Sequence, residues 1–213
     1  MRNDKAHFVA FIGVMFALIF VLFLLEGALL SGLGMTACIL SLPVSIALSI
    51  YDDWKKSFIG GTLLGASSCL FCLIFASAFI FYANPLISIL PRVFIGITAY
   101  WSYFGMSKLF KKVKNQYVRE MLPAAFAGVV GCLTNTILYL LAVNIWGGNV
   151  MGAFSQFISI AVTIYFPIEL VACFILVPIY VLVLKKISHK YIVKKPLVAE
   201  NIENDSEDRQ ENL

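Results

Sequence analysis

The sequence predicts an all-α integral membrane protein with six transmembrane helices and both termini in the cytoplasm. Of its 213 residues, 61% are hydrophobic and 13% are charged, whereas a typical soluble domain is about 25% charged. Six apolar segments, most of them close to the ~20 residues that cross a bilayer, alternate with short polar segments. We expect a transmembrane domain at residues 1–195 and a tail at residues 196–213.

Proline and glycine positions set the expected helix boundaries. The first apolar run follows a basic leader and lacks a small-residue cleavage site at its end, so it is expected to be a helix rather than a signal peptide. Glu26 closes this helix before a glycine-rich loop. Pro43 is expected to kink the second helix, and Pro91 to start the fourth. We expect helices at residues 8–25, 35–51, 57–82, 91–110, 121–145 and 154–184.

The loop charges predict the orientation of the chain. Fourteen of the sixteen Lys and Arg residues lie in four segments, namely the N-terminus and residues 52–56, 108–119 and 185–195. The alternate loops, at residues 26–34, 83–90 and 146–153, contain none. The positive-inside rule therefore places the basic segments in the cytoplasm and the three other loops outside. The expected location is the bacterial plasma membrane, as a multi-pass protein.

The formal charge of +4 divides unevenly between the two parts of the chain. Residues 1–195 carry fifteen Lys/Arg against six Asp/Glu, a net +9, and residues 196–213 carry one Arg against six acids, a net −5. The acidic tail has too few apolar residues for a core, so we expect it to be disordered. The basic body is explained by membrane orientation, and no nucleic-acid partner is expected.

The sequence contains none of the common catalytic motifs. It has no GxxxxGK[ST] phosphate loop, no HExxH and no GxSxG in a strand-to-helix context, and its two histidines lie at membrane edges. Five cysteines lie in apolar runs, and the Cys69-x-x-Cys72 pair has no second pair or histidine cluster beside it. We therefore expect no enzyme activity, no metal and no cofactor, and any pumping has to be energised by a partner or an ion gradient.

Small residues recur at helical spacing on three expected helices. Gly13 and Ala17 form such a pair on the first helix, and Gly61 and Gly65 form one on the third, where another helix can approach closely. On the fifth helix, a stripe of small and polar residues is expected to face inward or toward a cavity; it comprises Gly128, Gly131, Asn135 and Tyr139.

Arg92 is the main candidate for ligand binding. An arginine within a transmembrane segment costs about 2.5–3.5 kcal/mol on insertion scales, so its presence at the outer end of the fourth helix favours a functional role. A guanidinium suits a carboxylate or phosphate of a small water-soluble molecule. The other candidates are polar residues of the outer loops and helix ends: Asn84, Ser88, Asn135, Asn144, Trp146, Gln156 and Glu169. For each of them, a role as an interface anchor or as a packing residue is an equally open interpretation.

Glu169 lies in the middle of the sixth expected helix. A carboxylate near the bilayer centre tends to be protonated or paired. Two placements are open: a hydrogen bond to Asn135 of the fifth helix, or the floor of a binding cavity. A proton relay usually contains several such groups, and the sequence shows one within the expected helices.

These residues resemble a family of transport proteins. The six-helix layout, the Gly13/Ala17 pair, the small-residue stretch GGTLLGASS at residues 60–68, and Asn84-Pro85 followed by the stretch LPRVFIG at residues 90–96 are similar to the substrate-binding (S component) membrane subunits of energy-coupling-factor (ECF) vitamin transporters. The likeness covers roughly residues 8–185, and the Pro-Arg-x-x-x-Gly pattern is its most specific part.

The resemblance implies a high-affinity vitamin binder that works with a transmembrane coupling subunit and two cytoplasmic ATPases. In that family the small residues of the first helix, here Gly13 and Ala17, contact the coupling subunit, although the family pattern has alanine at both positions. The ligand binds near the outer ends of helices 4 to 6, under the three outer loops. Arg92 favours an acidic vitamin, with pantothenate the first choice and folate or a thiamine precursor as alternatives.

Two interpretations outside this family stay open. A small ion-coupled secondary transporter would use Glu169 as its proton carrier. A structural membrane protein without a ligand would keep Arg92, Asn135 and Glu169 as a buried pairing network.

Overall fold

The computed structural model describes six stretches of the chain: residues 2–30, 38–51, 57–75, 84–113, 115–146 and 161–186. About 95% of this part is helical, and no strand occurs in it. The chain divides into two compact units, Met1–Val181 and Leu182–Leu213. The helix packing and the candidate site belong to the first unit.

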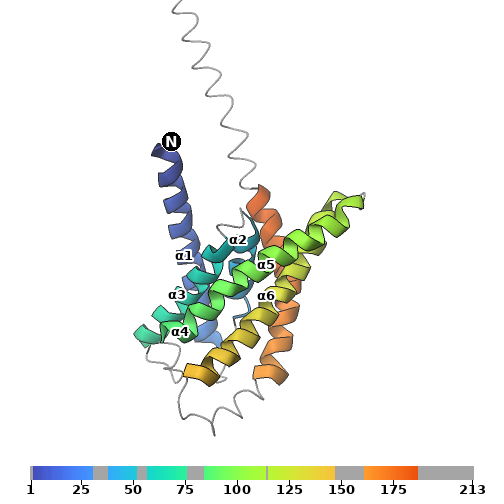
Figure 1. Cartoon of the computed structure of the whole chain (residues 1–213). Coiled ribbons are helices and arrows are strands. Elements are labelled where there is room, and N and C mark those ends of the chain that lie inside the picture. The colour runs from blue at the N-terminus through green and yellow to red at the C-terminus, as the bar shows by residue number, and fades with distance from the viewer. Residues whose placement is uncertain are drawn as a thin grey trace, which may run out of the picture. The chain divides into compact units, whose positions relative to one another are not determined.

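The helices follow one another along the chain in the order of their labels (Figure 1). Their bounds are α1 Arg2–Leu30, α2 Ser41–Tyr51, α3 Ser57–Phe75, α4 Pro85–Ser88, α5 Leu90–Leu109, the 3-10 turn η4 Phe110–Lys112, α6 Gln116–Trp146 and the π-helical turn η5 Ala161–Tyr165. The turn η5 leads into a last helix at residues 166–186. The fold class is therefore all-α, as predicted.

Within the described residues, five apolar helices are long enough to cross a membrane. They are Phe8–Ala28, Ser57–Ile74, Pro85–Leu109, Tyr117–Trp146 and Thr163–Lys186, which together support a multi-pass membrane protein. The second expected span is not among them, because α2 has 11 residues, a length of only about 16 Å. Six spans and the sidedness of the termini stay predictions.

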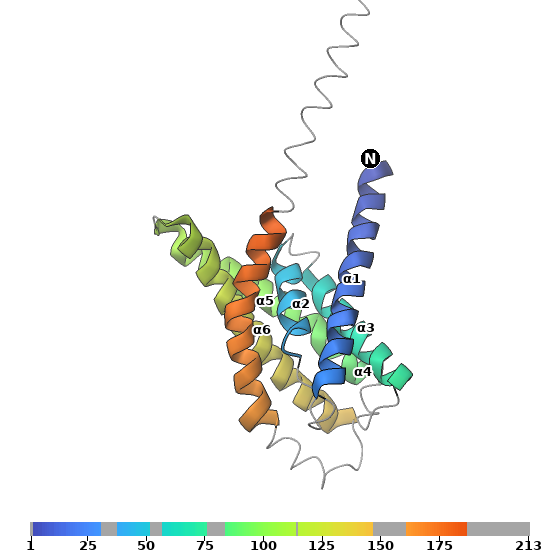
Figure 2. The ribbon, with the colours of Figure 1, turned by 180° about the vertical axis from the view of Figure 1, so that it is seen from behind.

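The helix α2 begins later than predicted and is not kinked by Pro43. Cys38–Leu40 form a turn, and the helix starts at Ser41, so that Pro43 lies in its first turn, where proline is tolerated. All residues from Ser41 to Ile50 are buried. The helices α1, α3, α5 and α6 surround this short helix, which Figure 2 shows from behind.

The helix α1 continues past its predicted end. It includes the basic leader and runs to Leu30, so Glu26 lies inside the helix and not at the start of a loop. Its side chain is 5% exposed, because it faces the start of α2. The rest of the loop expected at residues 27–34 is helical as far as Leu30, and residues 31–37 lie outside the described part.

Glycines on α3 let three helices approach closely. A Cβ placed on Gly60 would lie 2.2 Å from the carbonyl oxygen of Ser45 on α2, and one on Gly61 would lie 1.8 Å from the carbonyl oxygen of Arg92 on α5. A Cβ on Gly65 would lie 2.7 Å from Cα of Ile89. These distances leave no room for any side chain, so the predicted close-packing role of Gly61 and Gly65 is confirmed.

The predicted inward stripe of α6 is also confirmed. Gly128 packs on the backbone of Cys173, Gly131 packs on Ile46 of α2, and Asn135 is buried. Tyr139 packs against a small core cluster that joins α4 to α6, made of Ile87, Ala142 and Val143. The five cysteines are buried, as expected for packing residues.

Candidate binding site

Arg92 lies in the first turn of α5, directly after Pro91, as predicted. The structure buries it, however, with 4% of the residue exposed, whereas the sequence suggested a side chain open to the outer face. Its Nη1 donates to the carbonyl oxygen of Ser88 at 2.8 Å and to Ser88 Oγ at 3.1 Å. The guanidinium is therefore held in place by the turn that precedes its own helix.

The short helix α4 places Ser88 for this contact. Asn84 caps α4 by accepting a hydrogen bond from the backbone N–H of Leu86 at Oδ1, 3.0 Å away, which is a common role for asparagine before a first helical turn. The Ser88 hydroxyl also lies 3.2 Å from the carbonyl oxygen of Gly65 and 3.0 Å from Ser68 Oγ. Ser88 thus joins Arg92 to the glycine-rich face of α3.

Two carboxylates from different helices converge on the start of α2. Glu26 of α1 accepts hydrogen bonds from the backbone N–H groups of Leu40 and Ser41 and from Ser41 Oγ, the last at 2.6 Å. Glu169 of the last helix accepts from the backbone N–H of Cys38 at 2.8 Å. The first N–H groups of a helix have no partner within it, and these carboxylates supply acceptors there.

The charged groups of this region act on one another. Glu169 interacts electrostatically with both Glu26 and Arg92, and the Cys38 thiol interacts with all three. Burial in a low-dielectric interior strengthens such interactions. With both carboxylates ionised, the three charged side chains sum to −1. We call Glu26, Ser41, Arg92 and Glu169 the polar centre.

Asn135 is a buried polar residue of α6. It is 8% exposed, and its Oδ1 has no hydrogen-bond partner among the described residues. It lies one turn beyond Gly131, which packs on Ile46 of α2. The hydrogen bond to Glu169, one of the two placements left open by the sequence, is not formed, because Glu169 is directed to Cys38. An unpaired buried amide oxygen is costly and can accept a bond from a ligand.

The other predicted site residues lie apart from the polar centre. Asn84 caps α4, and Asn144 and Trp146 are exposed near the end of α6. Gln156 lies outside the described residues. Of the predicted set, Ser88 and Arg92 are in direct contact. Glu169 bonds the backbone before α2 and interacts electrostatically with Arg92.

The sequence predictions included neither Ser41 nor Ser68 among the site residues, and they placed Glu26 among the polar residues of the outer side, at the end of the first helix. The signal for Glu26 was present, because apolar residues continue on both sides of it to Leu30. Treating residues 8–30 as one helix would have placed a second carboxylate inside the membrane, where such groups are rare and functional.

Comparisons with protein-family models, with curated proteins and with solved structures give no match. The interpretation of the polar centre therefore depends on its own geometry and chemistry.

Proposed function

We propose that the chain is the vitamin-binding membrane subunit of an ECF-type importer and delivers a small water-soluble vitamin together with a coupling subunit and two ATPases. The observation that carries this proposal is the polar centre itself, with a buried arginine and two buried carboxylates among apolar helices, together with the unpaired amide oxygen of the buried Asn135. Burying charged groups is costly, which favours a functional reason for them. Of the Pro-Arg-x-x-x-Gly pattern, Arg92 belongs to this centre, whereas Gly96 packs on Ser57 and Ser49.

Pantothenate is the substrate we would test first. Its carboxylate suits the guanidinium of Arg92, since charge-assisted hydrogen bonds are the stronger kind. Its hydroxyl and amide groups are donors, and the two carboxylates of the centre and the Oδ1 of Asn135 are acceptors. Folate and thiamine precursors are the alternatives, and they differ from pantothenate in their acidic groups and in their hydrogen-bond donors.

We expect Arg92→Ala to weaken vitamin binding by about 2 kcal/mol or more, the loss of a charged hydrogen bond, or roughly 30-fold in Kd. The chain is purified in detergent, its co-purifying small molecule is identified by mass spectrometry, and the vitamins are titrated by calorimetry. Arg119→Ala is the matched control, because Arg119 is exposed on α6 away from the centre. Arg92→Lys separates loss of charge from loss of fold. Unchanged affinity in a folded Arg92→Ala chain would contradict the site, and no binding of any vitamin would contradict the function.

A second prediction concerns the proposed docking face on α1. Gly13 and Ala17 are exposed, and a Cβ on Gly13 would meet nothing within 4 Å. We expect Gly13→Leu to leave vitamin binding intact and to reduce co-purification of the coupling subunit and ATP-driven uptake at least tenfold, because the bulk is placed where a partner helix would approach. Gly105→Leu is the control, since Gly105 on α5 is equally open. Equal loss in both variants, or in neither, would argue against this face.

One observation favours an ion-coupled secondary transporter as the second candidate. The polar centre contains Glu26 as well as Glu169, so two intramembrane carboxylates interact where the sequence suggested one. Such pairs occur in proton pathways. This candidate predicts uptake by the chain alone in proteoliposomes with a pH gradient, and loss of that uptake in Glu169→Gln. The ECF proposal predicts no uptake without the ATP-hydrolysing partners.

A further inference from the structure

The hairpin that joins α5 to α6 ends in a cluster of cations. The helix α5 ends at Leu109, the turn η4 follows, and α6 begins at Gln116. Asn115 caps α6 by accepting from the backbone N–H of Tyr117 at Oδ1, 3.0 Å away. The side chains of Lys108, Lys111 and Arg119 are exposed here, and Glu120 is the only acid in residues 84–146. The end of this hairpin is therefore strongly basic.

The length of α6 places this end at or beyond the membrane surface. Its 31 residues correspond to about 46 Å, against about 30 Å of hydrocarbon. Tilt absorbs part of the difference, and Figure 1 shows α5 and α6 running side by side to a common end. The cations therefore fall at the depth of the lipid headgroups and not in the hydrocarbon.

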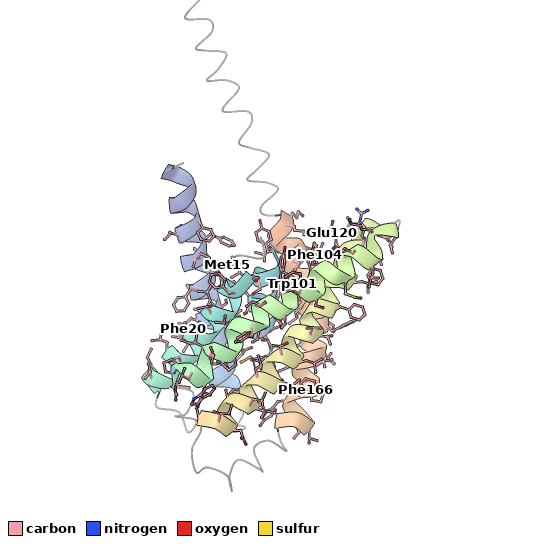
Figure 3. The ribbon with its side chains drawn as sticks, in the orientation of Figure 1. Met15, Phe20, Trp101, Phe104, Glu120 and Phe166 are labelled. Atoms are coloured by element: carbon pink, nitrogen blue, oxygen red, sulfur yellow. The ribbon has the colours of Figure 1, made fainter. Side chains whose placement is uncertain are left out.

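Aromatic residues lead along one face of α5 to these cations. Trp101, Phe104 and Lys108 are spaced three and four residues apart, so they share that face. The Trp101 and Phe104 rings meet edge to face with centroids 6.3 Å apart, and Lys108 Nζ lies 4.2 Å from the centre of the Phe104 ring. Figure 3 shows both rings on the hairpin, with Glu120 near its end. In membrane proteins, tryptophan typically lies at the interface near the acyl chains, and lysine lies farther out among the headgroups.

The apolar neighbours of the cations discriminate between possible partners. Leu109 is 73% exposed and Tyr117 is 70% exposed, directly beside Lys108, Lys111 and Arg119. The boundary between lipid headgroups and acyl chains accommodates apolar and cationic side chains together, because the apolar groups enter the acyl region and the cations contact phosphates. An acidic soluble partner would cover the cations and leave these apolar groups in water.

We propose that the α5–α6 hairpin binds anionic phospholipid headgroups through Lys108, Lys111 and Arg119, with Trp101 and Phe104 against the acyl chains. This lipid site is independent of the vitamin-binding proposal. It selects phosphatidylglycerol over phosphatidylcholine by charge, and each cation adds to that preference.

Lipid quenching of single tryptophans tests the proposal on the full chain. The W54F/W146F variant retains Trp101, and the W54F/W101F variant retains Trp146 at the other end of α6. Each is reconstituted with mixtures of brominated phosphatidylglycerol or brominated phosphatidylcholine, and quenching gives the relative affinity of each lipid beside that tryptophan. We expect a preference of about fivefold or more for phosphatidylglycerol at Trp101 and none at Trp146. High salt should reduce the preference, because the site is exposed.

Charge variants then assign the preference to these residues. K108Q/K111Q/R119Q should abolish the preference at Trp101, whereas K185Q/K186Q/K190Q, with equal charge removed elsewhere, should keep it. Quenching by brominated phosphatidylcholine alone shows that each variant is folded in the bilayer. Equal lipid affinities at Trp101, or a preference that survives in K108Q/K111Q/R119Q, would overturn the proposal. The proposal would also be overturned if K108Q/K111Q/R119Q lost the binding of a protein partner but kept the preference for phosphatidylglycerol.

Discussion

We expect Gly61→Ala to destabilise the fold by about 3 kcal/mol or more, beyond the usual 1–3 kcal/mol of an overpacked site. A Cβ at this position would lie 1.8 Å from the carbonyl oxygen of Arg92. That obstacle is backbone and cannot rotate away, so α3 and α5 would have to separate. Separation also disturbs Ser88 and Arg92, because Ser88 contacts Gly65 on the same face of α3. The measurement is the free energy of unfolding in mixed detergent micelles.

Gly13→Ala provides the matched control for this substitution. Both glycines lie inside helices, but a Cβ on Gly13 would meet nothing within 4 Å. The intrinsic helix preference for alanine over glycine, about 0.8–1.0 kcal/mol, should therefore leave Gly13→Ala neutral or slightly stabilising. If the two variants unfold alike, α3 and α5 do not approach each other this closely.

The sequence predicted the contacts of α3 and α6 well, for a physical reason. Close approach of two backbones requires residues without bulk, so Gly61, Gly65, Gly128 and Gly131 indicate the contact faces whatever helix lies opposite. Proline is similarly informative, because its missing N–H restricts Pro91 to the first turn of α5. These are local constraints, which a sequence shows directly.

The polar centre could be predicted only in part, because its partners are distant in the chain. The hydrogen bond from Cys38 to Glu169 joins residues 131 positions apart, and no spacing pattern reports such a pair. Hydropathy also misled the boundaries of α1 and α2. A carboxylate in a hydropathy profile indicates the end of an apolar run. Glu26 instead lies inside α1 and accepts a hydrogen bond from the backbone N–H of Ser41 at the start of α2.

The second large effect is expected at Glu26. Replacement by alanine removes the acceptor for the backbone N–H groups of Leu40 and Ser41 and for the Ser41 hydroxyl. A buried polar group left without a partner costs about 1–3 kcal/mol, so we expect Glu26→Ala to lower the free energy of unfolding by about 3–5 kcal/mol. Glu26→Gln keeps an acceptor oxygen and should cost about half as much. Glu120→Ala, at a half-buried carboxylate on α6, is the control.

A double-mutant cycle separates this capping role from a general effect of charge. Ser41→Ala removes only the hydroxyl, which lies 2.6 Å from Glu26 Oε2, so its cost should fall by about 1 kcal/mol or more when Glu26 is already glutamine. Additive effects would mean that the carboxylate does not hold the start of α2. Glu169 accepts from the backbone N–H of Cys38, just before the same helix, so both carboxylates bind the backbone at the start of α2. Any ligand or proton that reaches either carboxylate would then act on the position of that helix.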